Sequence, residues 1–297
     1  MSPWIQAARP RTLPLALSSI LMGSFLAAST GQFSWKIFGL AALTTVLLQV
    51  LSNFANDYGD AVSGIDNDTR KVAQRAVQSG KITRTQMRNA IIVSAGLALV
   101  SGLWLLYEAL QGATIQTFLA FLGLGLLAIV AAITYTVGKR PYGYMGLGDL
   151  SVLIFFGWLG VLGTYYLHTH SLNELLLLPA TSCGLFAVGV LNINNIRDIE
   201  NDARNGKNSI PVRLGKEKAV VYQWLLLMIG FVCAVVYTLL MGNSWIHWIF
   251  LISLPLLIKI GRGVAAGQQP ADIDPYLKQM ALTTLLFVVT FGLGQIL

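Results

Sequence analysis

Nine stretches of mostly apolar residues run through this sequence of 297 residues. A helix that crosses the hydrocarbon core of a membrane needs about 20 such residues, because its peptide groups must hydrogen-bond within the protein. Only 11% of the residues are charged, against about 25% in soluble domains. The chain is therefore predicted to be an all-α, multi-pass membrane protein of one domain, residues 1–297, with about nine transmembrane helices around a central cavity. The expected helices are residues 12–30, 38–58, 88–108, 115–136, 147–167, 174–196, 218–240, 244–261 and 280–296.

Lysine and arginine gather on one side of these predicted helices. With a cytoplasmic N-terminus, 19 of the 20 Lys and Arg residues lie in or beside inside segments, and only Lys36 falls outside. Because positively charged loops stay in the cytoplasm, the N-terminus and the ends of the even-numbered helices are predicted to face it. The net charge of +7 follows from this topology, and no nucleic-acid partner is implied.

Two clusters of acids and amides lie at the ends of the second and sixth apolar segments. They occupy residues 53–60 and 192–202, and both are predicted to emerge on the cytoplasmic side. Polar residues at the end of a membrane helix are costly and by default suggest function. Mg²⁺ in proteins prefers a few carboxylates together with the phosphate oxygens of a substrate. The two clusters therefore predict a metal-bridged diphosphate site.

Helical spacing aligns the polar residues within each cluster. Asn194, Asp198 and Asp202 are four positions apart, and the same spacing joins Asn56 to Asp60, so each set is expected to form one helical stripe. The alternative is that the acids cap helices or pair with Lys and Arg at the membrane surface. Two matching clusters on one side favour the site. The expected metal ligands are Asn56, Asp57, Asp60, Asn194, Asp198 and Asp202.

Basic residues accompany both clusters in the predicted inside loops. They suit a diphosphate whose charge Mg²⁺ alone does not neutralise, although single Lys and Arg residues in such loops also serve as topology signals. Asp149 is equally compatible with an N-terminal helix cap. The long polar segments 61–87 and 201–217 are expected to form cytoplasmic caps. The expected substrate-binding residues are Arg11, Gln49, Asn53, Lys139, Arg140, Tyr142, Asp149, Arg197 and Lys207.

Short motifs that fit one pattern are spread over nearly the whole chain. They are residues 8–14 (ARPRTLP), 56–60 (NDYGD), 135–138 (YTVG), 146–149 (GLGD), 194–198 (NNIRD) through Asp202, 206–207 (GK) and 213–215 (RLG). With these motifs the chain resembles the UbiA superfamily of intramembrane prenyltransferases, and within it the branch that prenylates 1,4-dihydroxy-2-naphthoate in menaquinone synthesis. Gly64 stands where the wider superfamily has the last Asp of its first motif, and Asp66 follows, which leaves the role of Asp66 open.

The resemblance implies an enzyme of the bacterial cytoplasmic membrane with its active site toward the cytoplasm. Such enzymes hold Mg²⁺ between the Asp-rich motifs and bind a polyprenyl diphosphate whose tail runs toward membrane lipid. In the naphthoate branch the prenyl group moves to the acceptor ring, and diphosphate and CO2 are lost, giving demethylmenaquinol. Tyrosine faces suit the allylic cation, although interfacial tyrosines also form the aromatic belt. The residues expected to take part in catalysis are Asp60, Asp198, Lys139 and Tyr135.

Two alternatives stand beside this expectation. The first is a related prenyltransferase with another aromatic acceptor, such as 4-hydroxybenzoate. The second is a transporter whose acids carry cations. Transporters place broken helices and ion ligands near the bilayer centre, whereas these clusters are predicted at helix ends beside long loops, which favours the enzyme.

Overall fold

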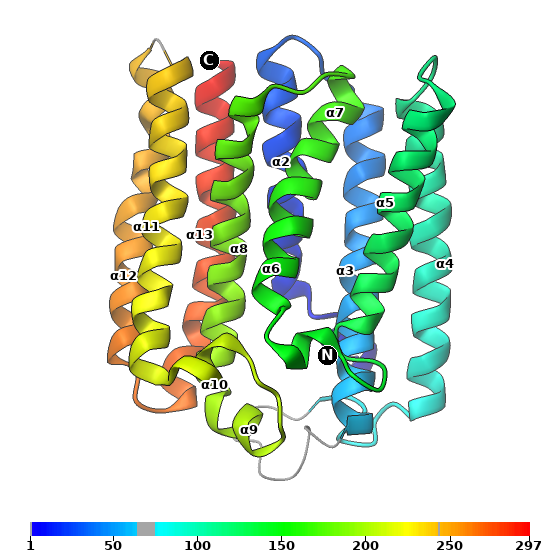
Figure 1. The fold of residues 1–297 in the computed structure, drawn as a ribbon, viewed down its shortest axis with the longest axis vertical. Coiled ribbons are helices and arrows are strands. Elements are labelled where there is room, and N and C mark those ends of the chain that lie inside the picture. Colours follow the sequence, from blue (N-terminus) through cyan, green and yellow to red (C-terminus); the bar gives the residue numbers. More distant parts are fainter. Residues whose placement is uncertain (1, 64–74, 243) are drawn as a thin grey trace.

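Membrane-spanning helices make up most of the protein. The computed structural model describes residues 2–63, 75–242 and 244–297. Within these residues all regular structure is helical, and nine segments are long and apolar enough to cross a membrane. They stand side by side as an upright bundle (Figure 1). The predicted all-α, multi-pass fold is confirmed. Asp66 and the greater part of the first expected cap lie outside the described residues.

Several of the spans consist of more than one helical piece. In chain order they are α1, η1 and α2 (Pro3–Ala8, Pro10–Thr12, Leu13–Ser29), α3 (Trp35–Ser63), α4 (Arg84–Ala109), α5 (Ile115–Thr134), α6, η3 and α7 (Gly148–Val152, Leu153–Leu162, Gly163–Thr169), η4 and α8 (Glu174–Leu176, Leu177–Arg197), α11 (Lys216–Met241), η5 and α12 (Trp245–Ser253, Leu254–Ala266) and α13 (Pro270–Ile296). Three short helices, η2 (Tyr142–Met145), α9 (Ile199–Arg204) and α10 (Ile210–Leu214), connect spans. The N-terminus, α9 and α10 lie at one end of the bundle, here called the N-terminal face, and the C-terminus lies at the other (Figure 1).

Helix boundaries differ from the prediction at two places that matter for the site. Helix α13 begins at Pro270, ten residues earlier than expected, because Pro270 occupies the first turn and Gln269 and Asp272 form a capping box. Helix α8 ends at Arg197, and α9 begins after Asp198, whose backbone (φ −98°, ψ 10°) leaves the helix. Backbone hydrogen bonds still join Asn194 to Asp198 at 3.1 Å and Asp198 to Asp202 at 2.8 Å, so the expected four-residue spacing of the second cluster is kept across a local distortion at Asp198.

The tightly packed core lies on the side of α8, α11 and α13. Phe186, Phe250, Phe287 and Phe291 are fully buried there, and their rings contact one another at centroid separations of 4.8 to 5.8 Å. Helix α5, at the other side, has no buried residue. Between them runs η3, a π-helix, a form frequent at functional sites. The packing is thus dense on one side and leaves room beside α5.

Helices α3 and α5 approach closely near the N-terminal face. A Cβ atom at Gly59 of α3 would lie 2.5 Å from the carbonyl oxygen of Thr136. We expect Gly59→Ala to force the helices apart and reduce the free energy of unfolding by about 1–3 kcal/mol, measured as a lower melting temperature of the purified protein. Gly39→Ala in the same helix is the control, because its Cβ meets nothing within 4 Å. Equal melting temperatures for both variants would contradict the close approach.

The orientation in the membrane is a prediction from the positive-inside pattern. Reporter domains fused after Arg140 or Arg213, on the N-terminal face, are expected to be cytoplasmic. Fusions near Lys36 or Tyr166, on the opposite side, are expected to report the outer face. A reporter active only outside the cytoplasm when fused after Arg213 would show that the bundle is inserted the other way round.

Candidate active site

A cavity of about 430 Å³ lies inside the bundle. Its wall is formed by residues from α2, α3, α4, α5, η3, α7, α8 and α13. At the N-terminal face the wall carries charged and amide side chains, among them Asp60 and Lys207. Further in, it is apolar, with Phe121, Phe156 and Leu167. The cavity therefore suits a ligand with an ionic head and a hydrocarbon body.

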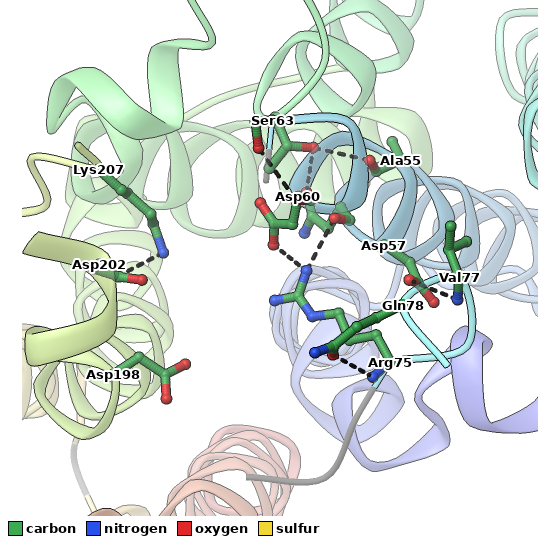
Figure 2. A network of polar contacts seen from close by, with 12 residues as sticks. Ala55, Asp57, Asp60, Ser63, Arg75, Val77, Gln78, Asp198, Asp202 and Lys207 are labelled. Atoms are coloured by element: carbon green, nitrogen blue, oxygen red, sulfur yellow. Dashed lines mark hydrogen bonds and ion pairs between the residues drawn. The ribbon is translucent and has the colours of Figure 1, made fainter. Parts of the chain in front are cut away.

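Asp60 is the buried acid of the first cluster at this cavity. Its side chain is 7% exposed and forms an ion pair with Arg75 (Figure 2). It also accepts a hydrogen bond from the Tyr144 hydroxyl. The Nη1 of Arg75 also donates to the backbone oxygen of Asn56 at 3.0 Å. Burial and the nearby Asp60 charge raise the pKa of Tyr144, so its hydroxyl stays protonated and remains a donor. Asp60 is thus held ionised by a cation and a neutral donor.

Asp57, one turn before Asp60, plays a different local role. Its carboxylate accepts hydrogen bonds from the backbone nitrogens of Ala76 and Val77, each at 3.3 Å, and it points away from Asp60 (Figure 2). Asp57 therefore anchors the turn that carries Arg75. Its predicted role as a metal ligand stays a prediction.

The second cluster combines acids with a buried arginine. Nε and Nη2 of Arg197 donate to the two carboxylate oxygens of Asp198 at 2.8 and 2.6 Å. Nη2 also donates to Oδ1 of Asn194 at 3.0 Å, and Nη1 to Oδ1 of Asp274 at 2.6 Å. The arginine side chain is only 3% exposed, so it depends on these partners.

A second ion pair of this cluster joins Asp202 of α9 to Lys207 in the loop that follows α9. Lys207 Nζ lies 2.8 Å from Oδ2 of Asp202. Burial raises the pKa of Asp202, and the Lys207 charge opposes that rise. Figure 2 shows this pair and Asp198 on one side of an open centre, with Asp60 and Arg75 on the other. The last turns of α3 and the junction of α8 with α9 thus bring acids of both clusters to the same end of the cavity.

The donor set at the cavity mouth fits Mg²⁺. Among the described residues no three His, Cys, Asp or Glu side chains form a ready-made metal cage, and Mg²⁺ usually completes its shell with water and substrate phosphate. Oxygen donors of Asn56, Asp60, Asn194 and Asn195 line the cavity. Oδ1 of Asn195 is buried without a hydrogen-bond partner in the described structure. Asp60, Asp198 and Asp202 each also form an ion pair with a positive side chain.

The cavity wall includes part of the predicted site. The predicted residues on it are Arg11, Gln49, Asn53, Asn56, Asp60, Tyr135, Tyr142, Asn194 and Lys207. Arg197, Asp198 and Asp202 lie behind this wall through the ion pairs above. Lys139 and Arg140 are exposed and are not wall residues in the described structure, so their substrate and catalytic roles stay predictions.

Three predicted substrate-binding residues have structural partners. Gln49 and Asn53 each donate to the Thr12 hydroxyl at 3.2 Å, and Asn53 also donates to the Ala8 oxygen at 2.9 Å. They therefore fasten the N-terminal segment to α3 while lining the cavity. Asp149 is not the N-cap of α6, which is Leu147. It accepts a 3.0 Å hydrogen bond from Tyr222.

Two predicted tyrosines meet at the wall. The rings of Tyr135 and Tyr142 pack edge to face with centroids 5.3 Å apart. A Cβ at Gly148 would lie 2.7 Å from the Tyr135 hydroxyl, so the glycine makes room for that ring. Burial raises the pKa of both tyrosines, and the Asp149 charge raises that of Tyr135 further. Both phenols are thus kept neutral, and their ring faces remain available to a cation.

Sequence reasoning missed several residues at the site. Arg75 lies in a loop and Tyr144 in the short helix η2, where one more Arg or Tyr carries no distinct signal. Asp274 and Lys278 were hidden because α13 was expected to begin after them, although the Pro270 and Asp272 capping pattern marks its true start. Lys278 lines the cavity.

An all-helical membrane bundle around a cavity with an ionic mouth and an apolar interior defines a class of proteins that handle lipid-like anions. The chain belongs to the UbiA prenyltransferase family, whose sequence model matches residues 16–290. It is 48% identical over 296 residues to proteins named 1,4-dihydroxy-2-naphthoate octaprenyltransferase from Haemophilus influenzae and Escherichia coli, covering 99% and 98% of this chain and 96% of each relative. A protein of the same name from Mycobacterium tuberculosis is 33% identical, covering 96% of this chain and 94% of that one. The predicted family is confirmed, and it is a family of enzymes.

Solved structures share the fold. A UbiA homolog from Archaeoglobus fulgidus bound to DMAPP and Mg²⁺ matches with a TM-score of 0.62 at 16% identity, covering 99% of both chains. The apo structure of a UbiA homolog from Aeropyrum pernix K1 matches with a TM-score of 0.68 at 17% identity, covering 94% of this chain and 96% of that one.

Proposed function

We propose that the protein transfers a polyprenyl group from a polyprenyl diphosphate to 1,4-dihydroxy-2-naphthoate, with loss of diphosphate and CO2, giving demethylmenaquinol in menaquinone synthesis. The observation that carries this proposal is the 48% identity, over nearly the full length, with two relatives named for that acceptor. The cavity supports it, because its ionic mouth suits the diphosphate and its apolar wall the tail. A solved homolog that binds DMAPP and Mg²⁺ supports the donor and the metal.

Two kinds of residue at the cavity mouth are proposed to bind the diphosphate of the donor, acids and amides through the metal and basic side chains directly. Asn56, Asp60 and Asn194, with Asp198 and Asp202 behind them, would hold Mg²⁺, and the bound ion would supply positive charge to the leaving diphosphate. Lys207 and Arg75, which also line the mouth, add charge-assisted hydrogen bonds to the phosphate oxygens.

The chemistry needs a dry cavity. When the carbon–oxygen bond of the donor breaks, its electron pair leaves with the diphosphate and an allylic cation remains. A ring carbon of the acceptor attacks that cation and forms the new carbon–carbon bond, and the ring regains its electrons when the carboxylate leaves as CO2. Phe155, Phe156 and Leu15 on the wall exclude water, which would otherwise capture the cation. The neutral rings of Tyr135 and Tyr142 stabilise it.

Arg11 is proposed to bind the acceptor carboxylate. It lines the cavity, and its side chain is 51% exposed with only a 4.0 Å contact to Asp274. Arg11→Ala is expected to raise the acceptor KM about tenfold, by loss of a charge-assisted hydrogen bond, and to leave the donor KM unchanged. The control is Arg88→Ala, which removes an exposed arginine of α4. Equal effects on donor and acceptor would remove Arg11 from the acceptor site.

A competition between acceptors tests the proposed function. The purified protein receives an allylic diphosphate, Mg²⁺ and equal amounts of 1,4-dihydroxy-2-naphthoate and 4-hydroxybenzoate. We expect kcat/KM to favour the naphthoate by at least about 100-fold, because unpaired polar groups penalise the wrong acceptor. Prenylated 4-hydroxybenzoate as the main product would replace the proposed acceptor.

A further inference from the structure

Asp274 of α13 bridges two cationic residues of the site. Its Oδ1 accepts the 2.6 Å hydrogen bond from Nη1 of Arg197, and its Oδ2 lies 4.0 Å from Nη1 of Arg11. The Asp274 side chain is 35% exposed, whereas the Arg197 side chain is 3% exposed. Asp274 therefore reaches from the protein surface to a buried arginine.

Arg197 is shared between two acids. One edge of its guanidinium, Nε and Nη2, holds both oxygens of Asp198, while Nη1 holds Asp274. The planar guanidinium presents donors in fixed directions, so the two carboxylates occupy separate edges. Both carboxylate oxygens of Asp198 thus accept a hydrogen bond from Arg197 in this structure.

Metal binding at Asp198 changes the ion pairs available to Arg197. When Asp198 turns its oxygens to a metal ion, Arg197 loses one of the two carboxylates that lie 2.6 Å from it, and a buried cation without a partner is strongly unfavourable. Asp274 keeps a carboxylate on the other edge of the guanidinium throughout. It therefore lowers the free energy needed to release Asp198.

We propose that Asp274 is a positioning residue of the metal–diphosphate site, which holds Arg197 from α13 so that Asp198 exchanges its arginine for a metal ion. The inference rests on the proposed function for the identity of the site. Asp274 acts through Arg197 and itself contacts neither metal nor substrate.

The test measures metal affinity directly. The full-length purified protein in lipid nanodiscs is titrated with Mn²⁺, with free Mn²⁺ read by electron paramagnetic resonance, in the presence of inorganic diphosphate. Asp274→Asn is expected to weaken Mn²⁺ binding about tenfold and to raise the half-saturating Mg²⁺ concentration for turnover by the same factor, with kcat at saturating Mg²⁺ unchanged within about threefold. Asp274→Glu is expected to restore affinity.

A matched control lies half a turn away. Asp272 accepts hydrogen bonds from the backbone nitrogens of Gln268 and Gln269 and caps α13. Asp272→Asn is expected to lower the melting temperature without changing Mn²⁺ affinity. If Asp274→Asn behaves in the same way, with unchanged metal affinity, Asp274 only stabilises the helix and the inference is overturned.

A double-mutant cycle tests the route through Arg197. In an Arg197→Gln background, Asp274→Asn is expected to have no further effect on Mn²⁺ affinity, because no arginine is left to hold. An additive effect would overturn the inference, as would a wild-type protein that binds no Mn²⁺. A tenfold loss of affinity together with a product other than prenylated naphthoate would support the role of Asp274 while refuting the proposed acceptor.

Discussion

Asp60→Asn is expected to reduce prenyl transfer at least about 1000-fold while the protein still inserts and folds. Asp60 is the only acid among the described residues that lines the cavity, and it is buried beside Arg75 and Tyr144. The substitution replaces one carboxylate oxygen by an NH2 group and removes the negative charge that pairs with Arg75, so metal binding and the Asp60–Arg75 ion pair are lost together. Initial rates with saturating donor, acceptor and Mg²⁺ measure the effect, and the melting temperature confirms folding.

Glu200→Gln provides the control for Asp60→Asn. Glu200 is an acid on the same face of the bundle, but its side chain is 66% exposed and lies 3.8 Å from the exposed Arg204. Exposed ion pairs contribute little, so this variant is expected to keep wild-type turnover. A folded Asp60→Asn protein that also keeps wild-type turnover would remove Asp60 from the metal site.

Lys207→Met is expected to lower kcat/KM for the prenyl diphosphate about 100-fold. Lys207 lines the cavity mouth and is held by Asp202 at 2.8 Å, which places its ammonium group where the diphosphate is proposed to bind. Steady-state kinetics with varied donor measure the change, and Lys207→Arg, which keeps the charge, should recover part of it.

The control for Lys207 is Lys218→Met, which removes an exposed lysine at the start of α11 and should leave both substrates unaffected. If Lys207→Met instead raises only the acceptor KM and leaves the donor kinetics unchanged, Lys207 belongs to the acceptor site and the assignment of the diphosphate position is incorrect.

The helices could be predicted because a segment in lipid has to form its backbone hydrogen bonds within itself. Long apolar runs such as residues 115–134 admit few other structures. The start of α13 could not be found in this way, because Asp272, Asp274 and Lys278 interrupt the apolar pattern where the helix leaves the membrane. A hydropathy pattern reports burial in lipid and does not distinguish a polar helical turn from a loop.

The site was predictable to the level of its two clusters. Asp60, at the end of the second apolar segment, and Lys207, in the polar segment after the second cluster, both line the cavity. The ion-pair partners could not be predicted from the sequence, because Arg75 contacts Asp60 and Asp274 contacts Arg197 only through tertiary packing. The break at Asp198 also has no signal in the spacing, because a residue that leaves the helix keeps its place in the sequence.

In the proposed reaction, the protein prenylates a naphthoate ring and the ring carboxylate is released as CO2. The most direct test incubates the purified protein with an allylic diphosphate, Mg²⁺ and 1,4-dihydroxy-2-naphthoate labelled with ¹³C in its carboxyl group, followed by mass spectrometry of the quinol and the released gas. The expected result is one prenylated naphthoquinol without the label, an equal amount of ¹³CO2, and no product when EDTA removes the metal. A prenylated product that retains the labelled carboxyl group, or full turnover in EDTA, would contradict the account.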